Sequence, residues 1–204
     1  MTTEVTETKY LSFIKANSKI FFYSIIVLIF LIIASLWLIN KSQSEKVKVS
    51  EDYIKAQFLI EQNSETEAKE ILNNIIKKKN NIYSSLSLFL MIDKNLEKDS
   101  DTVLSHFDYI INNNSYPKED LNLLRLKKAI YISDIEKEQE IIELLNPLIN
   151  SDSVWKTHAL KFLGDFYYSF NQFQKAKQYY SMLLQDEEIS KVDINRKIKL
   201  IDNE

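Results

Sequence analysis

The chain has 204 residues, which is enough for one domain and little more. It contains one glycine, two prolines and no cysteine, and its formal net charge is −3. The scarcity of turn-forming residues argues against an all-β fold, the lack of cysteine excludes disulfides and thiolate chemistry, and the mixed charge gives no electrostatic reason to expect nucleic acid as a partner.

An apolar run without any charge occupies residues 20–39 and reads IFFYSIIVLIFLIIASLWLI. As a helix it would extend about 30 Å, the thickness of the hydrocarbon core of a bilayer. Lys19 and Lys41 bracket the run, and Tyr23 and Trp37 lie near its ends, where amphipathic rings prefer the membrane interface. We therefore predict an uncleaved transmembrane helix, because a signal peptide would have a shorter apolar core followed by a small-residue cleavage site.

The expected layout is a polar head over residues 1–19, the span over 20–39, a linker over 40–48 and a helical domain over 49–204. Lysines occur closely on both sides of the span. The positive-inside rule therefore barely decides which end of the span faces the cytoplasm.

Apolar residues recur at helical spacing beyond the span. Two of the stripes consist of Ile71, Leu72, Ile75 and Ile76, and of Ile141, Leu144, Leu145 and Leu148. Polar breaks separate the stripes at 63–64, 77–81, 95–101, 112–117, 133–134, 150–153 and 171. Breaks at this spacing predict pairs of helices with a repeat of about 34–40 residues, which is typical of a helical array.

Gly164 is the only glycine, and it lies in a segment that should be helical, LGDFYYSFNQFQKAKQYY over 163–180. A glycine inside a helix costs about 1 kcal/mol relative to alanine, so close packing must offset that cost. The spacing Leu163-Gly164-x2-Tyr167-x8-Ala176-x3-Tyr180 resembles the tetratricopeptide repeat. We expect two antiparallel helices to approach closely at Gly164 and Ala176.

Earlier segments repeat this spacing of small residues. Ala56 and Ala68 are separated as Gly164 and Ala176 are, and Ala129 lies 35 residues before Gly164. A fourth helix pair, near residues 82–112, is inferred from the helical pattern alone. The sequence thus predicts an all-α chain, in which one transmembrane helix precedes an α-α superhelix of about four tetratricopeptide-like hairpins.

A polar head, one span and a small repeat domain together resemble the bacterial ancillary Sec-translocon subunit family. The closest likeness is in the segment LLNPLINSDSVWKTHALKFLGDFYYSFNQFQKAKQYYSMLLQD. Departures from the family pattern are Asn171-Gln172, where Gly-Asp is common, and a missing proline after Asp186. The positions that resemble the family are Leu145, Pro147, Leu148, Ser153, Trp155, Ala159, Leu160, Ala176, Asp186 and the terminal-helix residue Arg196.

This resemblance implies an anchor in the bacterial inner membrane, with a cytoplasmic amino terminus and a periplasmic repeat domain. It further implies work beside the Sec translocon, together with a membrane-anchored prolyl-isomerase-like chaperone, on exported client proteins. The residues themselves leave other classes open: a scaffold for cell-envelope assembly or division, a membrane scaffold that faces the cytoplasm, and a membrane-tethered enzyme.

Residues that would carry catalysis or hold a cofactor do not form a known motif in this sequence. His106 and His158 are the only histidines, and their separation of 52 residues matches no metal-ligand spacing. A single glycine leaves no phosphate-binding loop and no dinucleotide fingerprint. We expect a non-enzymatic protein without metal, cofactor or small-molecule substrate.

Aromatic residues are concentrated in the last hairpin, where we expect most of them to pack in the core. Superhelical arrays also offer a groove that can hold extended peptides. The motif spacing assigns this groove to the first helix of each pair. The candidate groove residues are Tyr53, Gln57, Leu126, Ile130, Lys161, Asp165 and Tyr168.

Overall fold

The computed structural model of the chain describes residues 18–113, 115–133, 137–185 and 191–202. Over these residues the protein consists of α-helices joined by short connections and has no strand, so the prediction of an all-α fold is confirmed. The chain divides into two compact units, with the boundary between Glu51 and Asp52.

The first helix, α2 (Ser18–Glu61), continues without a break for 44 residues. It is long and apolar enough to cross a membrane, and its apolar side chains from Phe22 to Leu38 are exposed. The segment 40–48, which we assigned to a linker, is part of this helix, because no glycine or proline interrupts it. Residues 1–17 of the predicted head lie outside the described residues.

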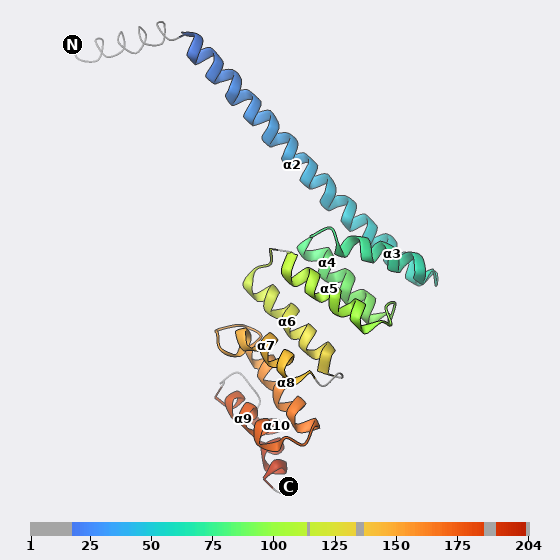
Figure 1. The fold of residues 1–204 in the computed structure, drawn as a ribbon, viewed down its shortest axis with the longest axis vertical. Helices are drawn as coiled ribbons and strands as arrows, with labels where there is room; N and C mark the ends of the chain where they lie inside the picture. Colours follow the sequence, from blue (N-terminus) through green and yellow to red (C-terminus); the bar gives the residue numbers. More distant parts are fainter. Residues whose placement is uncertain (1–17, 114, 134–136, 186–190, 203–204) are drawn as a thin grey trace, which may run out of the picture. The chain divides into compact units, whose positions relative to one another are not determined.

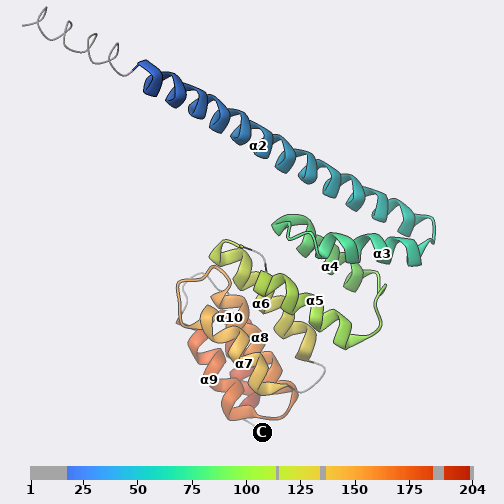
Figure 2. The same ribbon diagram turned by 45° about the horizontal axis from the view of Figure 1, so that its top comes forward.

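Further helices follow in chain order: α3 (Glu65–Ile76), α4 (Asn81–Asp93), α5 (Ser100–Asn113), α6 (Lys118–Ile132), α7 (Glu138–Ile149), α8 (Lys156–Ser169), α9 (Phe173–Leu183) and α10 (Lys191–Ile201). Each helix from α3 to α9 packs on the next one in the chain, as Figures 1 and 2 show. The connections from α2 to α9 fall at the predicted polar breaks, whereas the break between α9 and α10 was not predicted. Helices α4 and α5 occupy the segment of the fourth predicted pair.

Asparagine ends three of the helices in a chain that has only one glycine. Asn63, Asn95 and Asn171 have positive φ values of 58°, 51° and 58°. After each one, the next backbone N–H donates to the carbonyl five residues earlier, as in the bond from Gln172 to Tyr167 of 2.9 Å. This is the Schellman arrangement, in which asparagine can replace the usual glycine. The Asn171-Gln172 turn therefore forms without the glycine.

Side chains also connect alternate helices. The rings of Tyr53 in α2 and Tyr83 in α4 lie 5.5 Å apart, centroid to centroid. The hydroxyls of Ser85 in α4 and Tyr116, just before α6, lie 2.6 Å apart. These contacts place the carboxyl-terminal part of α2 beside α4, and α4 beside α6.

The same relation holds further along the chain. Trp155, just before α8, donates its indole N–H to the carbonyl of Glu119 in α6 at 3.0 Å. Lys175 of α9 donates to the carboxylate of Glu138 in α7 at 2.6 Å. Within the described residues, each of α2, α4 and α6 thus lies beside the next even-numbered helix, and α7 lies beside α9.

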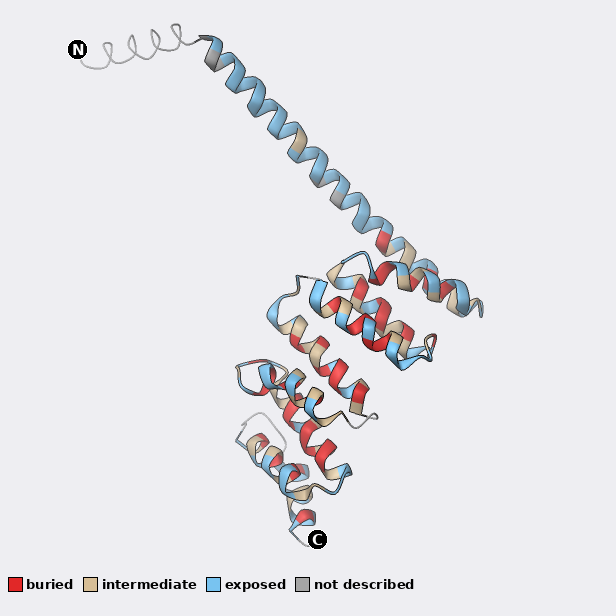
Figure 3. Cartoon of the chain, viewed as in Figure 1, coloured by how far each residue is buried: buried red, intermediate tan, exposed pale blue. Residues whose placement is uncertain are grey.

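The core lies between neighbouring helices, and buried positions recur along α4 to α8 in Figure 3. The predicted small residues are all in it: Ala56, Ala68, Ala129 and Ala176 are 0% exposed, and Gly164 is buried. Alanine and glycine at such positions let neighbouring helices approach closely.

Gly164 of α8 lies directly against the ring of Tyr180 in α9. A Cβ atom added at Gly164 would lie 2.6 Å from Cδ1 and 3.0 Å from Cζ of that ring. The ring cannot easily move, because Tyr180 is 0% exposed and its hydroxyl donates to Asp165 at 2.6 Å. The absent side chain therefore makes room for a buried tyrosine, and this packing offsets the cost of glycine in the helix.

We predict that Gly164→Ala lowers the free energy of unfolding by about 1–3 kcal/mol, the usual cost of overpacking a core. Alanine is the better helix former by about 1 kcal/mol, so helix propensity alone predicts the opposite sign. Urea denaturation of the full chain in detergent micelles, followed by circular dichroism, measures the difference.

Tyr180→Val provides the control, because valine ends at Cγ and lacks all the ring atoms that the new methyl group would meet. Gly164→Ala should cost less in the Tyr180→Val background than in the native chain. A Gly164→Ala variant as stable as the native protein would show that this contact does not require glycine.

Candidate functional site

A groove with a volume of about 400 Å³ opens between α4 and α6. Its lining consists of Phe89, Ile92 and Asp93 from α4, Phe107 from α5, and Lys127, Ile130 and Tyr131 from α6. Ligand pockets of proteins have volumes of about 300–1,000 Å³ and mainly apolar walls with few polar groups. The groove has the size and composition of a binding site for one or two large apolar side chains.

Sequence spacing explains why these residues meet. On each of the two wall helices, the lining residues are separated by three and four positions, as Phe89, Ile92 and Asp93 are, so they share one face of the helix. Phe107 forms the floor and is only 1% exposed. Its ring centroid lies 6.4 Å from that of Phe89 and 6.0 Å from that of Tyr131.

Exposed apolar side chains continue from the groove along α4. Ile82 and Leu86 are 67% and 39% exposed, and they precede Phe89 at helical spacing. On α2, Ile54 and Phe58 are also exposed, and α2 contacts α4 through the Tyr53–Tyr83 ring pair. We call Ile54, Phe58, Ile82 and Leu86 the apolar face. Groups of exposed apolar side chains mark interaction sites in soluble domains.

Of the predicted groove residues, Ile130 lines the groove and is 43% exposed. Leu126 does not, because it is 4% exposed and belongs to the hydrophobic core; its assignment to an open groove is wrong. Tyr53 is half-buried against Tyr83, and Gln57 is exposed on α2.

Two of the three candidates on α8, Lys161 and Asp165, belong to a polar network, and the third, Tyr168, packs near an aromatic ring. Asp165 accepts hydrogen bonds from Lys161 at 2.7 Å, from the hydroxyl of Tyr180 at 2.6 Å and from Lys197 of α10. The ring of Tyr168 packs near Phe173, at 5.6 Å between centroids. The polar atoms of Asp165 are thus engaged by α9 and α10, and they tie α10 to α8.

Sequence reasoning missed most of the groove lining. The α4–α5 pair was inferred from helical pattern alone, so no residue of it was assigned to a binding surface. Phe89, Ile92 and Phe107 contribute from this pair. The signal available in the sequence was the spacing of Ile82, Leu86 and Phe89, which places three large apolar residues on one face of a single helix.

The residue after the groove-lining Lys127 is a buried lysine that pairs with two carboxylates. Lys128 is 5% exposed, and its ammonium group lies 2.8 Å from Asp108 and 2.8 Å from Glu140. Burial alone would lower the pKa of Lys128, but the hydrogen bonds from its ammonium group to the two carboxylates outweigh burial and raise it. Lys128 therefore stays charged and joins α5, α6 and α7.

The two histidines do not form a common site. His106 is 9% exposed within α5, and burial lowers the pKa of its imidazole, so it is neutral at pH 7. His158 is exposed, and its ring contacts Trp155 at 5.6 Å between centroids. In the part of the chain that the structure describes, no three His, Asp or Glu side chains converge in a way that would hold a metal ion.

Comparison with family models, curated proteins and solved structures finds no match to this chain. The functional interpretation therefore depends on the geometry of the groove, on the apolar face and on the long apolar helix.

The Asp165 network predicts a pH dependence of stability. Burial would raise the pKa of Asp165, but its bonds with Lys161, Lys197 and Tyr180 lower it overall. A carboxyl group with a lowered pKa stabilises the fold above its unfolded pKa of about 3.9 and loses this contribution as the pH falls through the folded pKa. Asp165→Asn should therefore lower the Tm at pH 7, and the deficit should shrink as the pH falls from about 5 toward 2.

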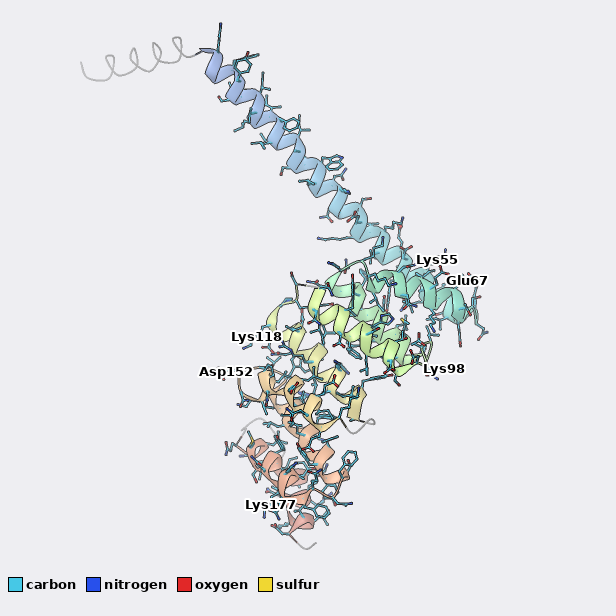
Figure 4. All side chains as sticks on the ribbon, viewed as in Figure 1. Lys55, Glu67, Lys98, Lys118, Asp152 and Lys177 are labelled. Carbon is cyan, nitrogen blue, oxygen red and sulfur yellow. The ribbon has the colours of Figure 1, made fainter. Side chains whose placement is uncertain are left out.

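The matched control is Asp152→Asn, which changes an exposed carboxylate in the loop before α8 (Figure 4). Thermal melts of both variants and the native chain over this pH range give the comparison. A deficit for Asp165→Asn that is the same at every pH would contradict the ion-pair role of Asp165.

Proposed function

We propose that this chain is a non-enzymatic, single-pass membrane protein whose helical domain binds segments of other proteins. The observation that supports this proposal most strongly is the apolar groove between α4 and α6, together with the exposed residues of the apolar face on α2 and α4. The long apolar helix α2 supports a membrane anchor. In this proposal, α2 crosses the membrane once through residues 20–39.

We further propose that the domain consists of four tetratricopeptide-like hairpins: the end of α2 with α3, α4 with α5, α6 with α7, and α8 with α9. Packing of each helix from α3 onward on its chain neighbour supports this pairing, as do the contacts between alternate helices and the buried alanine and glycine residues. In this scheme α10 closes the array, because its Ile194 and Ile201 are buried in the same core as α8 and α9.

The mechanism would be tethering. A domain confined to the membrane surface by α2 meets membrane partners at a higher effective concentration than a diffusing domain does. The packed helices then present the groove as a preorganised surface, so that little conformational entropy is lost when a partner segment binds.

The partners and the compartment follow from the family resemblance. The proposed location is the bacterial inner membrane, with the amino terminus in the cytoplasm and the helical domain in the periplasm. There the protein would assist the Sec translocon together with a membrane-anchored prolyl-isomerase-like chaperone, and the groove would contact exported client proteins. Nucleic acids and small-molecule substrates are not part of this proposal.

Two other scaffolds would use the same surface. A scaffold for cell-envelope assembly or division would share the topology but bind different proteins, which a pull-down experiment would identify. A scaffold facing the cytoplasm would place the domain on the other side of the membrane. A reporter enzyme fused after Glu204 that is active only in the periplasm, or only in the cytoplasm, separates these topologies.

We predict that a photoreactive amino acid at Ile130 crosslinks the protein to translocon components or exported chains in living cells. Ile130 lines the groove and is exposed, so its replacement should leave the fold intact. Mass spectrometry of the crosslinked products identifies the captured proteins.

The matched control places the same amino acid at Glu70, which is exposed on α3. Capture at Ile130 but not at Glu70 supports the groove as the binding surface. If a folded, membrane-inserted protein captures nothing from Ile130, the proposed function is wrong.

A further inference from the structure

We propose that the groove recognises a protein segment in which one or two bulky apolar side chains stand next to a carboxylate, and that Lys127 binds this carboxylate. The inference rests on the proposed function, because it specifies the chemistry of the partner that the groove would hold.

Lys127 is an exposed lysine whose neighbours on the same face of α6 are apolar. Residues three and four positions away on a helix are its neighbours, and these are Leu123, Leu124, Ile130 and Tyr131. No carboxylate on α6 can therefore pair with Lys127 at these spacings. The described part of the chain contains no ion pair of Lys127 with any other helix.

Neighbouring charges at the groove already have partners. The carboxylate of Asp93, on the opposite wall, lies 3.1 Å from the ammonium group of Lys94. Lys128, which follows Lys127 in the chain, is buried between Asp108 and Glu140. Of the two charged residues in the lining, Asp93 is paired with Lys94, whereas Lys127 has no ion pair within the described residues, and an incoming carboxylate would complement it.

The apolar walls define the other half of the ligand. Phe107 is recessed at 1% exposure, and Phe89, Ile92 and Tyr131 are half-buried around it. Rings that line a hollow of about 400 Å³ accept side chains that enter it. A bilayer surface is contacted by side chains that protrude, as those of the apolar face do, whereas the groove is a hollow that an incoming side chain can enter. The groove itself thus fits a protein segment better than a lipid surface.

The test uses full-length protein in detergent micelles and fluorescent, end-blocked peptides of two sequences. One peptide carries Leu-Phe followed by Glu-Glu, and the other carries Leu-Phe followed by Gln-Gln. Fluorescence anisotropy should give about two- to fivefold tighter binding of the acidic peptide, the strength of an exposed ion pair. High salt should remove this preference.

Lys127→Gln should abolish the preference, so that the acidic peptide binds no more tightly than the Gln-Gln peptide. Lys118→Gln, at an exposed lysine near the start of the same helix (Figure 4), should retain the preference. Equal binding of both peptides by the native chain, or a preference that survives Lys127→Gln, would overturn the inference.

A third outcome would point to a membrane partner. If neither peptide binds, but phosphatidylglycerol vesicles bind in a Lys127-dependent way, the inference of a protein segment is wrong. The photocrosslinking result at Ile130 is independent of charge preference. Protein capture there without a preference for the acidic peptide would reject this inference and leave the proposed function standing.

Discussion

The fold depends on helices that bury their apolar stripes against their neighbours in the chain. From α3 to α10 each helix packs on the next, and the buried side chains of α5 to α10 form one continuous hydrophobic core. One close contact lies between α8 and α9, where Gly164 makes room for the buried ring of Tyr180. The one glycine of the chain thus lies where any side chain would collide with an aromatic ring.

This mode of packing also explains why a binding surface remains open. The α8 end of the array is engaged by α10, whose Lys197 bonds to Asp165 and whose apolar residues join the core. Within the described residues, the groove between α4 and α6 remains open, with Phe107 at its floor. The helices α4 and α6 thus pack within the helical domain and also form the walls of the candidate site.

The sequence was sufficient to predict those features that depend on local pattern. The apolar run, the polar breaks and the buried small residues all follow from spacing, and the structure contains them. Spacing did not predict that Leu126 is buried, because the rotation of α6 about its own axis depends on contacts with α5 and α7. It also did not identify Tyr180 as the reason for Gly164, since a contact between two helices is not encoded in either one alone. The groove residues of α4 were not predicted either, because the groove forms only where α4 meets α5 and α6.

We propose that a protein partner covers the groove between α4 and α6 while the chain is in its native membrane. Because the chain has no cysteine, Ile130→Cys and Glu70→Cys each introduce a single thiol, whose labelling rate with a hydrophilic maleimide reports its accessibility. In isolated native membranes made permeable to the reagent, we expect the thiol at position 130 to react slowly, and in the purified protein we expect it to react rapidly. The thiol at position 70 should react rapidly in both. Equal rates at Ile130 in membranes and in purified protein would contradict the claim.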